Sequence, residues 1–379
     1  MPTGYNPLTN TRINGILQGL LDPRLLPGNL IFSGRIPETP AEDGEIMARF
    51  IGYIQVADLV ADDSRAVTYS AGKFQYETVN IPNLKIGAYL TQSMIKQLYQ
   101  IQANGASSAV DNDGFNSSVA RMMSNVLTGI RQRKEILLAG MLMDGFNYSR
   151  LGINLTNVTW GMPSDLKITT AVPWATAASA TPVDDLYNAR LVGRTRYGVE
   201  YNRVTMSTGA FRLMIATTEF QNKAKILPPI LLMGGYTPLP MSNLQQQQQI
   251  AEAVIGMPIE LYDARYASQD SRGQWYYAPI LDLNAVILTS SGFDNDRNAA
   301  DWANGVVTES IVASWAGEPI GGGPSYGPVG YTTFPENLNP PNITVWGVQR
   351  GFPRKNLLQY NACLRVGTVV DPIAPGVPF

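Results

Sequence analysis

Few residues in this chain could carry out chemistry. The sequence has no histidine and a single cysteine, so zinc sites built from histidine and cysteine and the usual histidine general base are excluded. Residues 323–327 match the G-x-S-x-G pattern in which a serine, here Ser325, attacks an ester or amide. That pattern needs a preceding strand, a following helix and a histidine base, whereas glycines precede it here and Pro328 follows. A hydrolase using Ser325 is an alternative from another class, and we expect no enzyme.

The other short motifs also favour structure over chemistry. Gly72-Lys73 lacks the upstream glycine and following Ser/Thr of a phosphate-binding loop, so it is interpreted as a turn. Asp294, Asp296 and Asp301 resemble a calcium loop, but no glutamate closes it. Cys363 lies in an apolar stretch and is interpreted as a small buried side chain. The sequence therefore predicts no catalytic residue, no cofactor and no metal site.

Composition excludes further classes of protein. Lys and Arg number 28 and Asp and Glu number 30, which leaves a net charge of -2 and no basic surface for a dedicated nucleic-acid reader. Charged residues make up 15% of the chain, against about 25% in soluble domains. Such a low value is expected if much of the surface lies against neighbouring subunits. No apolar run reaches the ~18 residues of a membrane span, and residues 1–10 lack a signal-peptide pattern, so we expect synthesis in a cytoplasm.

Residues 65–81 show the alternation typical of β-strands and predict a long hairpin with its turn at Gly72-Lys73. An isolated hairpin is marginally stable in water, so its apolar side chains need a partner. The candidate contacts in this hairpin are Val67, Tyr69, Lys73, Phe74 and Tyr76.

The strongest helical signal covers residues 115–144, where apolar side chains recur at spacings of three and four. We predict one long amphipathic helix with Asn116 as its N-cap and Gly145 at its end. Arg131 and Glu135 are one turn apart, predict an i,i+4 ion pair, and complete the candidate inter-subunit contacts.

The rest of the chain alternates strands and helices. Thr181, a proline and two acidic residues predict a helix start, and Gly193 predicts its end. Strands and helices up to about residue 335 predict an αβ domain, and later strands, near 343–350 and 357–370, return to the earlier β-structure. The fold class is therefore α+β.

This order of parts resembles the major capsid proteins of tailed bacteriophages, specifically the lambda-like major head protein family. The resemblance covers nearly the whole chain in organisation. The residues that carry it are the run 130–140 (Ile-Arg-Gln-Arg-Lys-Glu-Ile-Leu-Leu-Ala-Gly), Trp174, the run 182–186 (Pro-Val-Asp-Asp-Leu), Tyr197-Gly198 and Met206-Ser207.

The resemblance implies the Hong Kong 97 type shell fold. It implies an N-terminal arm at 1–55, an extended loop at 56–92, a peripheral domain at 93–182 with spine helix 115–144, an axial domain at 183–335, and returning peripheral strands with a C-terminal tail at 336–379.

It also implies the function of a major capsid protein of a tailed double-stranded DNA phage, located in the virion. Copies would assemble into the pentamers and hexamers of an icosahedral head around DNA held without sequence-specific contacts. The implied partners are a separate scaffolding protein, a portal protein at one vertex and, in some shells, a decoration protein at three-fold sites. Some relatives link Lys to Asn covalently, a role for which Lys73 is placed. An encapsulin-like cellular nanocompartment shell is the alternative within the same fold.

Overall fold

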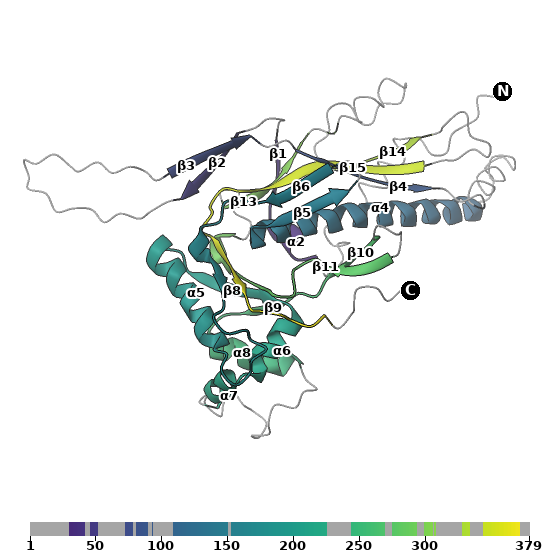
Figure 1. Ribbon diagram of the computed structural model, residues 1–379. Helices are drawn as coiled ribbons and strands as arrows, with labels where there is room; N and C mark the ends of the chain where they lie inside the picture. The colour runs from purple at the N-terminus through teal and green to yellow at the C-terminus, as the bar shows by residue number, and fades with distance from the viewer. Residues whose placement is uncertain are drawn as a thin grey trace, which may run out of the picture.

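A computed structural model of the 379-residue chain shows an elongated molecule in which one long helix lies between two sheets (Figure 1). The structure describes residues 30–41, 46–51, 73–78, 81–89, 93, 109–150, 153–225, 244–269, 275–293, 299–305, 307, 328–333 and 344–371.

The described elements mix helices and strands along the whole chain. The helices are α2 (Phe32–Arg35), α4 (Ala109–Met143), α5 (Pro182–Tyr197), α6 (Thr208–Ala216), α7 (Thr218–Ala224) and α8 (Leu244–Ile255), with 3-10 turns η2 (Ser164–Leu166) and η3 (Ser291–Phe293). The strands are β1 (Glu38–Pro40), β2 (Ile46–Ile51), β3 (Lys73–Thr78), β4 (Asn83–Tyr89), β5 (Phe146–Arg150), β6 (Ile153–Val158), β7 (Lys167–Thr169), β8 (Tyr201–Met206), β9 (Ile259–Leu261), β10 (Arg265–Gln269), β11 (Trp275–Pro279), β12 (Ala285–Ser290), β13 (Ala300–Asn304), β14 (Val329–Thr333), β15 (Thr344–Lys355) and β16 (Asn361–Arg365). The α+β class is confirmed.

Two five-stranded sheets organise these elements. The upper sheet has the order β1-β13-β15-β14, with β4 also paired to β15. The lower sheet has the order β7-β16-β12-β8-β9 and carries helices α5 to α8 (Figure 1). We call α4 with the upper sheet the upper lobe, and the lower sheet with its helices the lower lobe. Three two-stranded ribbons, β2-β3, β5-β6 and β10-β11, complete the described strands.

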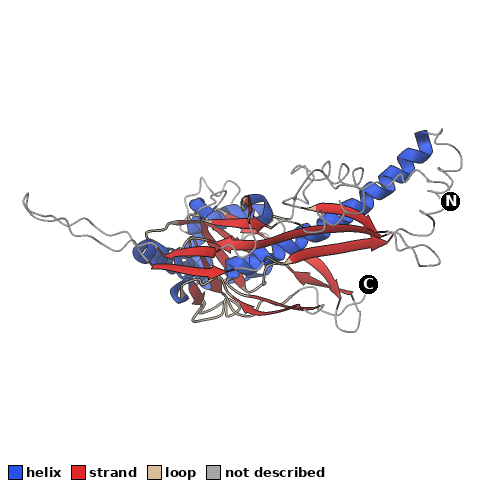
Figure 2. Cartoon of the chain, turned by 90° about the horizontal axis from the view of Figure 1, so that it is seen from above, coloured by secondary structure: helices blue, strands red, loops and turns tan. Residues whose placement is uncertain are grey.

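Helix α4 packs against the upper sheet at close range. A side chain at Gly347 of β15 would collide with Val126 and Ile130, so only glycine lets the strand approach the helix this closely. Figure 2 shows the helix running along the strands and extending past them at its N-terminal end. The apolar stripe predicted from sequence is therefore the buried face of this helix, with Leu137, Leu138 and Met141 in the core.

The bounds predicted for this long helix are corrected at both ends. The helix begins at Ala109, so Asn116 lies inside it and is not the N-cap. Asp144, and not Gly145, takes the left-handed conformation that ends it, with φ 52°. The amide of Asp144 donates to the Met141 carbonyl at 3.2 Å, and that of Gly145 donates to the Gly140 carbonyl at 3.0 Å. These two bonds form a Schellman motif.

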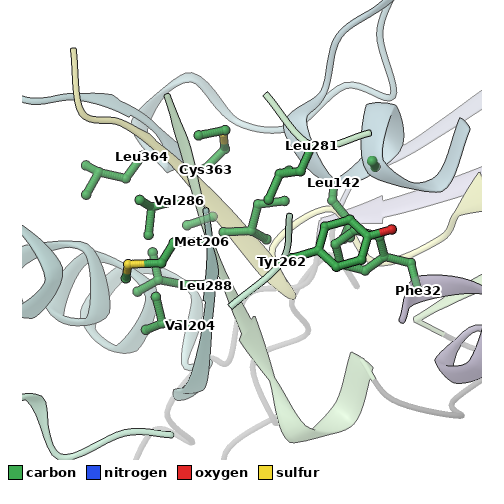
Figure 3. Packing of buried hydrophobic residues seen from close by; sticks show 14 of the residues in the cluster. Phe32, Leu142, Val204, Met206, Tyr262, Leu281, Val286, Leu288, Cys363 and Leu364 are labelled. Atoms are coloured by element: carbon green, nitrogen blue, oxygen red, sulfur yellow. The ribbon is translucent and has the colours of Figure 1, made fainter. Parts of the chain in front are cut away.

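The lower sheet forms the other half of one continuous core (Figure 3). Strand β12 lies between β16 and β8, and all six of its residues are buried, which explains why its first four residues are all apolar and show no alternation. Cys363 of β16 lies beside Ile287 of β12 and is buried, as predicted. Burial raises the pKa of its thiol to about 11, so the neutral form prevails.

Helix α5 is one turn longer than predicted. Gly193 does not end it; the helix continues to Tyr197 and ends at Gly198, which has a left-handed φ of 65°. The Thr181 side chain makes no cap hydrogen bond. The carboxylate of Glu219, from α7, accepts the amides of Val183 and Asp184 at 3.0 and 3.2 Å instead. A tertiary contact therefore replaces the local cap.

Gly193→Ala should destabilise the protein, although the same exchange in a free helix stabilises it by about 1 kcal/mol. A methyl group at residue 193 would overlap the ring of Tyr201, which is fully buried and donates its hydroxyl to the Gln359 carbonyl at 2.8 Å. We expect a loss of about 1–3 kcal/mol from overpacking, measured by chemical unfolding. Gly34→Ala is the matched control, because residue 34 is also helical and has open space around it.

The strand pairing around residues 65–81 also differs from prediction. Lys73 is the first residue of β3 rather than part of a turn, and β3 pairs in antiparallel fashion with β2, from Ile51↔Lys73 to Ile46↔Thr78. The pairing therefore begins at Ile46, within the segment predicted as N-terminal arm. Alternation identified β3 as a strand but could not identify its partner.

Sheet membership also crosses the predicted domain limits. Strand β13, predicted within the axial domain, lies in the upper sheet between β1 and β15. Strand β16, predicted to return to the peripheral domain, lies in the lower sheet between β7 and β12. Among the described strands after residue 336, only β15 pairs with β4 and packs along α4, whereas β16 meets α4 near its C-terminal end. Chain order therefore does not fix which sheet a strand joins.

Candidate functional site

The candidate contacts predicted in the hairpin fall in two groups. Val67 and Tyr69 lie outside the described residues. Lys73, Phe74 and Tyr76 lie on β3, where they pair with Ile51, Phe50 and Ala48 of β2. Figure 1 shows this ribbon extending away from the upper sheet, and within the described part of the chain each of its strands pairs only with the other.

The two ends of the ribbon are attached close together, one to the last residue of β13 and the other to Arg350 of the adjacent strand β15. On one side, the amide of Ala41 donates to the Asn304 carbonyl at 2.8 Å. On the other, the Ile81 carbonyl accepts from Arg350 Nε at 3.0 Å, and the Arg350 carbonyl accepts from the amide of Gly305 at 3.0 Å. The ribbon therefore projects from two neighbouring points of the upper sheet. Its described strands make no pairs with the strands of that sheet.

Glu135, predicted to face another subunit, lies inside the chain and is fully buried. Its Oε1 accepts from the amide of Phe32 at 2.7 Å and from the hydroxyl of Tyr262 at 2.9 Å. Its Oε2 accepts from the amide of Ser33 at 2.7 Å. This carboxylate therefore joins α4 to α2 and to the loop after β9.

Arg131 and its neighbour Lys134 are placed next to another carboxylate, that of Glu38. The Lys134 ammonium pairs with Glu38, and Asn304 Nδ2 donates to Glu38 Oε2 at 2.7 Å. Burial alone would raise the pKa of Glu38, but Lys134, Asn304 and Arg131 outweigh that effect and lower it. Arg131 is partly buried, which lowers the pKa of its guanidinium against the opposing effect of Glu38. Sequence analysis missed Glu38 because its partners Lys134 and Asn304 lie 96 and 266 residues away.

A buried polar seam continues from Glu38 between β1, β13 and β15. Asn304 Oδ1 accepts from Trp302 Nε1 at 3.0 Å and from Gln349 Nε2 at 2.9 Å. Next to it, Asp301 forms an ion pair with Arg354, and both bond to the hydroxyl of Thr39. Asp301 and Asn304, two polar residues in an otherwise apolar strand, were the available sequence signal.

Asp301, the third carboxylate of the calcium-loop motif, thus forms an ion pair with Arg354. The other two carboxylates of that motif, and Ser325 of the G-x-S-x-G match, lie outside the described residues. Among the residues that the structure describes, no group of His, Cys, Asp or Glu side chains could hold a metal ion, and no helix is long and apolar enough to cross a membrane.

The lower lobe presents an apolar strip to solvent. Tyr187 and Leu191, one turn apart on α5, are 61% and 43% exposed. Exposed charges flank them. Asp184 lies toward the start of the helix and pairs with a basic residue of the same lobe. Arg194 lies toward its end and pairs with an acidic residue of the same lobe. A strip of this kind is typical of a surface that contacts another protein.

The match to a protein family distinguishes between the functions considered above. The model of a family described as phage major capsid protein E matches residues 51–292, nearly two thirds of the chain. The chain belongs to this family. The prediction of a major capsid protein of the lambda-like kind is therefore confirmed, and its place is the capsid shell.

Solved structures show that this capsid protein shares the fold of other capsid proteins. A prophage capsid protein from Escherichia coli CFT073 aligns with a TM-score of 0.57 at 13% identity, covering 95% of this chain and 99% of its own. A phage-related protein from Bordetella bronchiseptica RB50 aligns with a TM-score of 0.54 at 12% identity, covering 96% and 98%. No curated protein matches the sequence.

An encapsulin complex from Synechococcus elongatus PCC 7942 aligns with a TM-score of only 0.41 at 12% identity, covering 89% of this capsid protein and 86% of that chain. This likeness is too low to support the encapsulin-like alternative against the family match.

Proposed function

We propose that this capsid protein assembles into pentamers and hexamers that close an icosahedral head around a double-stranded DNA genome. The observation that carries the proposal is the β2-β3 ribbon, which extends from the body and whose described strands pair only with each other. A two-stranded ribbon is marginally stable alone in water. Lying on a neighbouring subunit, its apolar side chains would gain further contacts.

The parts of the chain then take the following roles. The ribbon and its connection form the extended loop, beginning at Ile46 rather than at residue 56. The upper lobe with α4 is the peripheral domain and its spine helix. The lower lobe is the axial domain, which faces the five-fold and six-fold axes and brings the strip of Tyr187 and Leu191 to a neighbouring copy.

The proposed partners follow from the same assembly. A separate scaffolding protein directs closure, a portal protein occupies one vertex, and some shells add a decoration protein at three-fold sites. The near-neutral charge of -2 suits a wall that holds DNA without tight or sequence-specific contacts, because firm phosphate binding needs a basic surface. Synthesis takes place in the host cytoplasm, and the role is structural rather than enzymatic.

Negative-stain electron microscopy beside size-exclusion chromatography of the expressed chain tests this function. We expect closed icosahedral shells, or free pentamers and hexamers that close when scaffolding protein is added. A monodisperse monomer under both conditions would contradict the proposal. Genes for a terminase and a portal next to the gene of this chain would separate a phage head from an encapsulin-like shell, which would instead have a cargo enzyme as neighbour.

A further inference from the structure

The two lobes share one apolar core along α4, and among the described residues polar contacts also join them at two places on this helix. At the C-terminal end of α4, Asn361 of β16 donates to the Leu142 carbonyl at 2.7 Å, and Lys167 of β7 pairs with Asp144. Two turns earlier, at Glu135, the lobes meet through a third segment, residues 30–41, which we call the strap. The two places are about 10 Å apart along the helix axis, at 1.5 Å per residue.

The strap is bound to the upper lobe along most of its length. Its α2 amides donate to Glu135, as described above, and Glu38 pairs with Lys134. Strand β1 then pairs in parallel with β13, from Glu38↔Trp302 to Pro40↔Asn304. These contacts hold the strap to α4 and to the edge of the upper sheet.

The same strap is also bound to the lower lobe. Arg35 forms an ion pair with Glu260 of β9, and Glu260 in turn accepts from Thr205 of β8 at 3.2 Å. The ring of Phe32 packs on that of Tyr262, with centroids 5.1 Å apart and planes inclined by 57°. Figure 3 shows Phe32 and Tyr262 beside Leu142 of α4, at the point where the two lobes meet.

Glu135 is the residue at which all three segments converge. It belongs to α4, it accepts two amides from the strap, and it accepts the hydroxyl of Tyr262 from the lower lobe. Its carboxylate is fully buried, so losing any of these donors is costly. Polar contacts at two places fix the orientation of the lobes more firmly than those at the end of α4 alone, in addition to the apolar core that the lobes share.

We infer that the strap sets the orientation of the two lobes and that its hydrogen bonds to Glu135 hold it in place. When the strap is released, the lower lobe can turn about the C-terminal end of α4. Residues 1–29 precede the strap directly, so a pull on that part of the chain acts on the angle between the lobes. This inference concerns the single subunit and does not depend on the proposed assembly.

Distance measurement between spin labels tests the inference in the full-length, monomeric fraction of the protein. Asn125 on α4 and Asn188 on α5 are exposed and lie on different lobes, so cysteines at these two positions report the angle. The native Cys363 needs no replacement, because it is 2% exposed and burial raises the pKa of its thiol. We expect one narrow distance distribution in the otherwise unchanged protein.

Glu135→Ala should broaden and shift that distribution, and should speed hydrogen exchange at the amides of Phe32 and Ser33 by about tenfold. Glu219→Ala is the matched control, because Glu219 also accepts two successive amides at the start of a helix, but within the lower lobe. It should leave the distribution unchanged. If Glu135→Ala lowers folding yield, Arg35→Ala, which removes a partly exposed ion pair with Glu260, gives the same shift in smaller measure.

Two results would overturn the inference. One is an unchanged distance distribution in Glu135→Ala, or in Arg35→Ala, while exchange shows that the strap has been released. The other is an equal change in Glu135→Ala and Glu219→Ala, which would mean that loss of any such carboxylate loosens the whole chain. Exchange rates at β12, in the centre of the lower sheet, show that the fold itself is intact.

Discussion

Replacing residues 46–78 by a short Gly-Ser linker is expected to abolish shell assembly and leave the rest of the chain folded. The linker can be short because the two ends of the ribbon lie close together. Ala41 is bound to Asn304, and Ile81 lies next to Gly305. The described strands of the ribbon take no part in the two main sheets, so their pairing should survive. What is lost is the apolar area that the ribbon buries on a neighbour, at ~25 cal/mol per Å².

A second variant tells which part of the protrusion holds the shell. Since Ile51 pairs with Lys73, an Asn-Gly turn in place of residues 52–72 would close β2 and β3 into a tight hairpin. Electron microscopy gives shell yield, and thermal unfolding shows that the body remains folded. Normal shells from the chain without residues 46–78 would refute the role given to the ribbon. Shells from the shortened hairpin alone would assign the contact to the paired strands.

Local pattern predicted which segments are helices and strands, but not what ends them or what they pair with. Period and length identified α4 and α5 correctly. Their C-terminal ends were misplaced because Asp144 and Gly198 take the left-handed conformation. The start of α5 was placed correctly, but its cap comes from Glu219 of another helix and not from the Thr181 side chain. The hairpin was misassigned because alternation does not specify which strand an alternating strand pairs with. Its actual partner, β2, lies in a segment that was predicted to be an extended arm.

The candidate residues show the same limit. The spacing of Arg131 and Glu135 is the spacing of a surface ion pair, yet Glu135 turned out to be a buried acceptor for the strap and Tyr262. Its three donors come from residues 102 to 127 positions away. Nothing in the helix itself distinguishes such a glutamate from an exposed one, since both lie one turn from a basic residue.

Asp144→Ala should cost about 3 kcal/mol of stability, because Asp144 stabilises the end of α4 both through its backbone conformation and through a side-chain hydrogen bond. Its backbone has a φ of 52°, which costs an alanine roughly 1–2 kcal/mol. Its Oδ1 accepts from the amide of Trp160 at 2.6 Å, and that buried amide would lose its partner, at about 1–3 kcal/mol. Its other oxygen pairs with Lys167, which is 40% exposed and can return to water.

Comparing Ala, Asn and Gly at residue 144 separates the backbone contribution from the side-chain contribution. Asp144→Asn keeps an acceptor for Trp160 and tolerates the left-handed conformation, so it should cost only about 1 kcal/mol. Asp144→Gly removes the backbone strain but not the lost hydrogen bond, and should fall between Asn and Ala. Chemical unfolding followed by the intrinsic fluorescence of the six tryptophans gives the free energy of unfolding of each variant. Glu200→Ala, which breaks an exposed ion pair, is the control. If Gly equals or exceeds Ala in cost, the backbone conformation contributes nothing; if Asn equals Ala, the ion pair with Lys167 and not the amide bond holds this end of the helix.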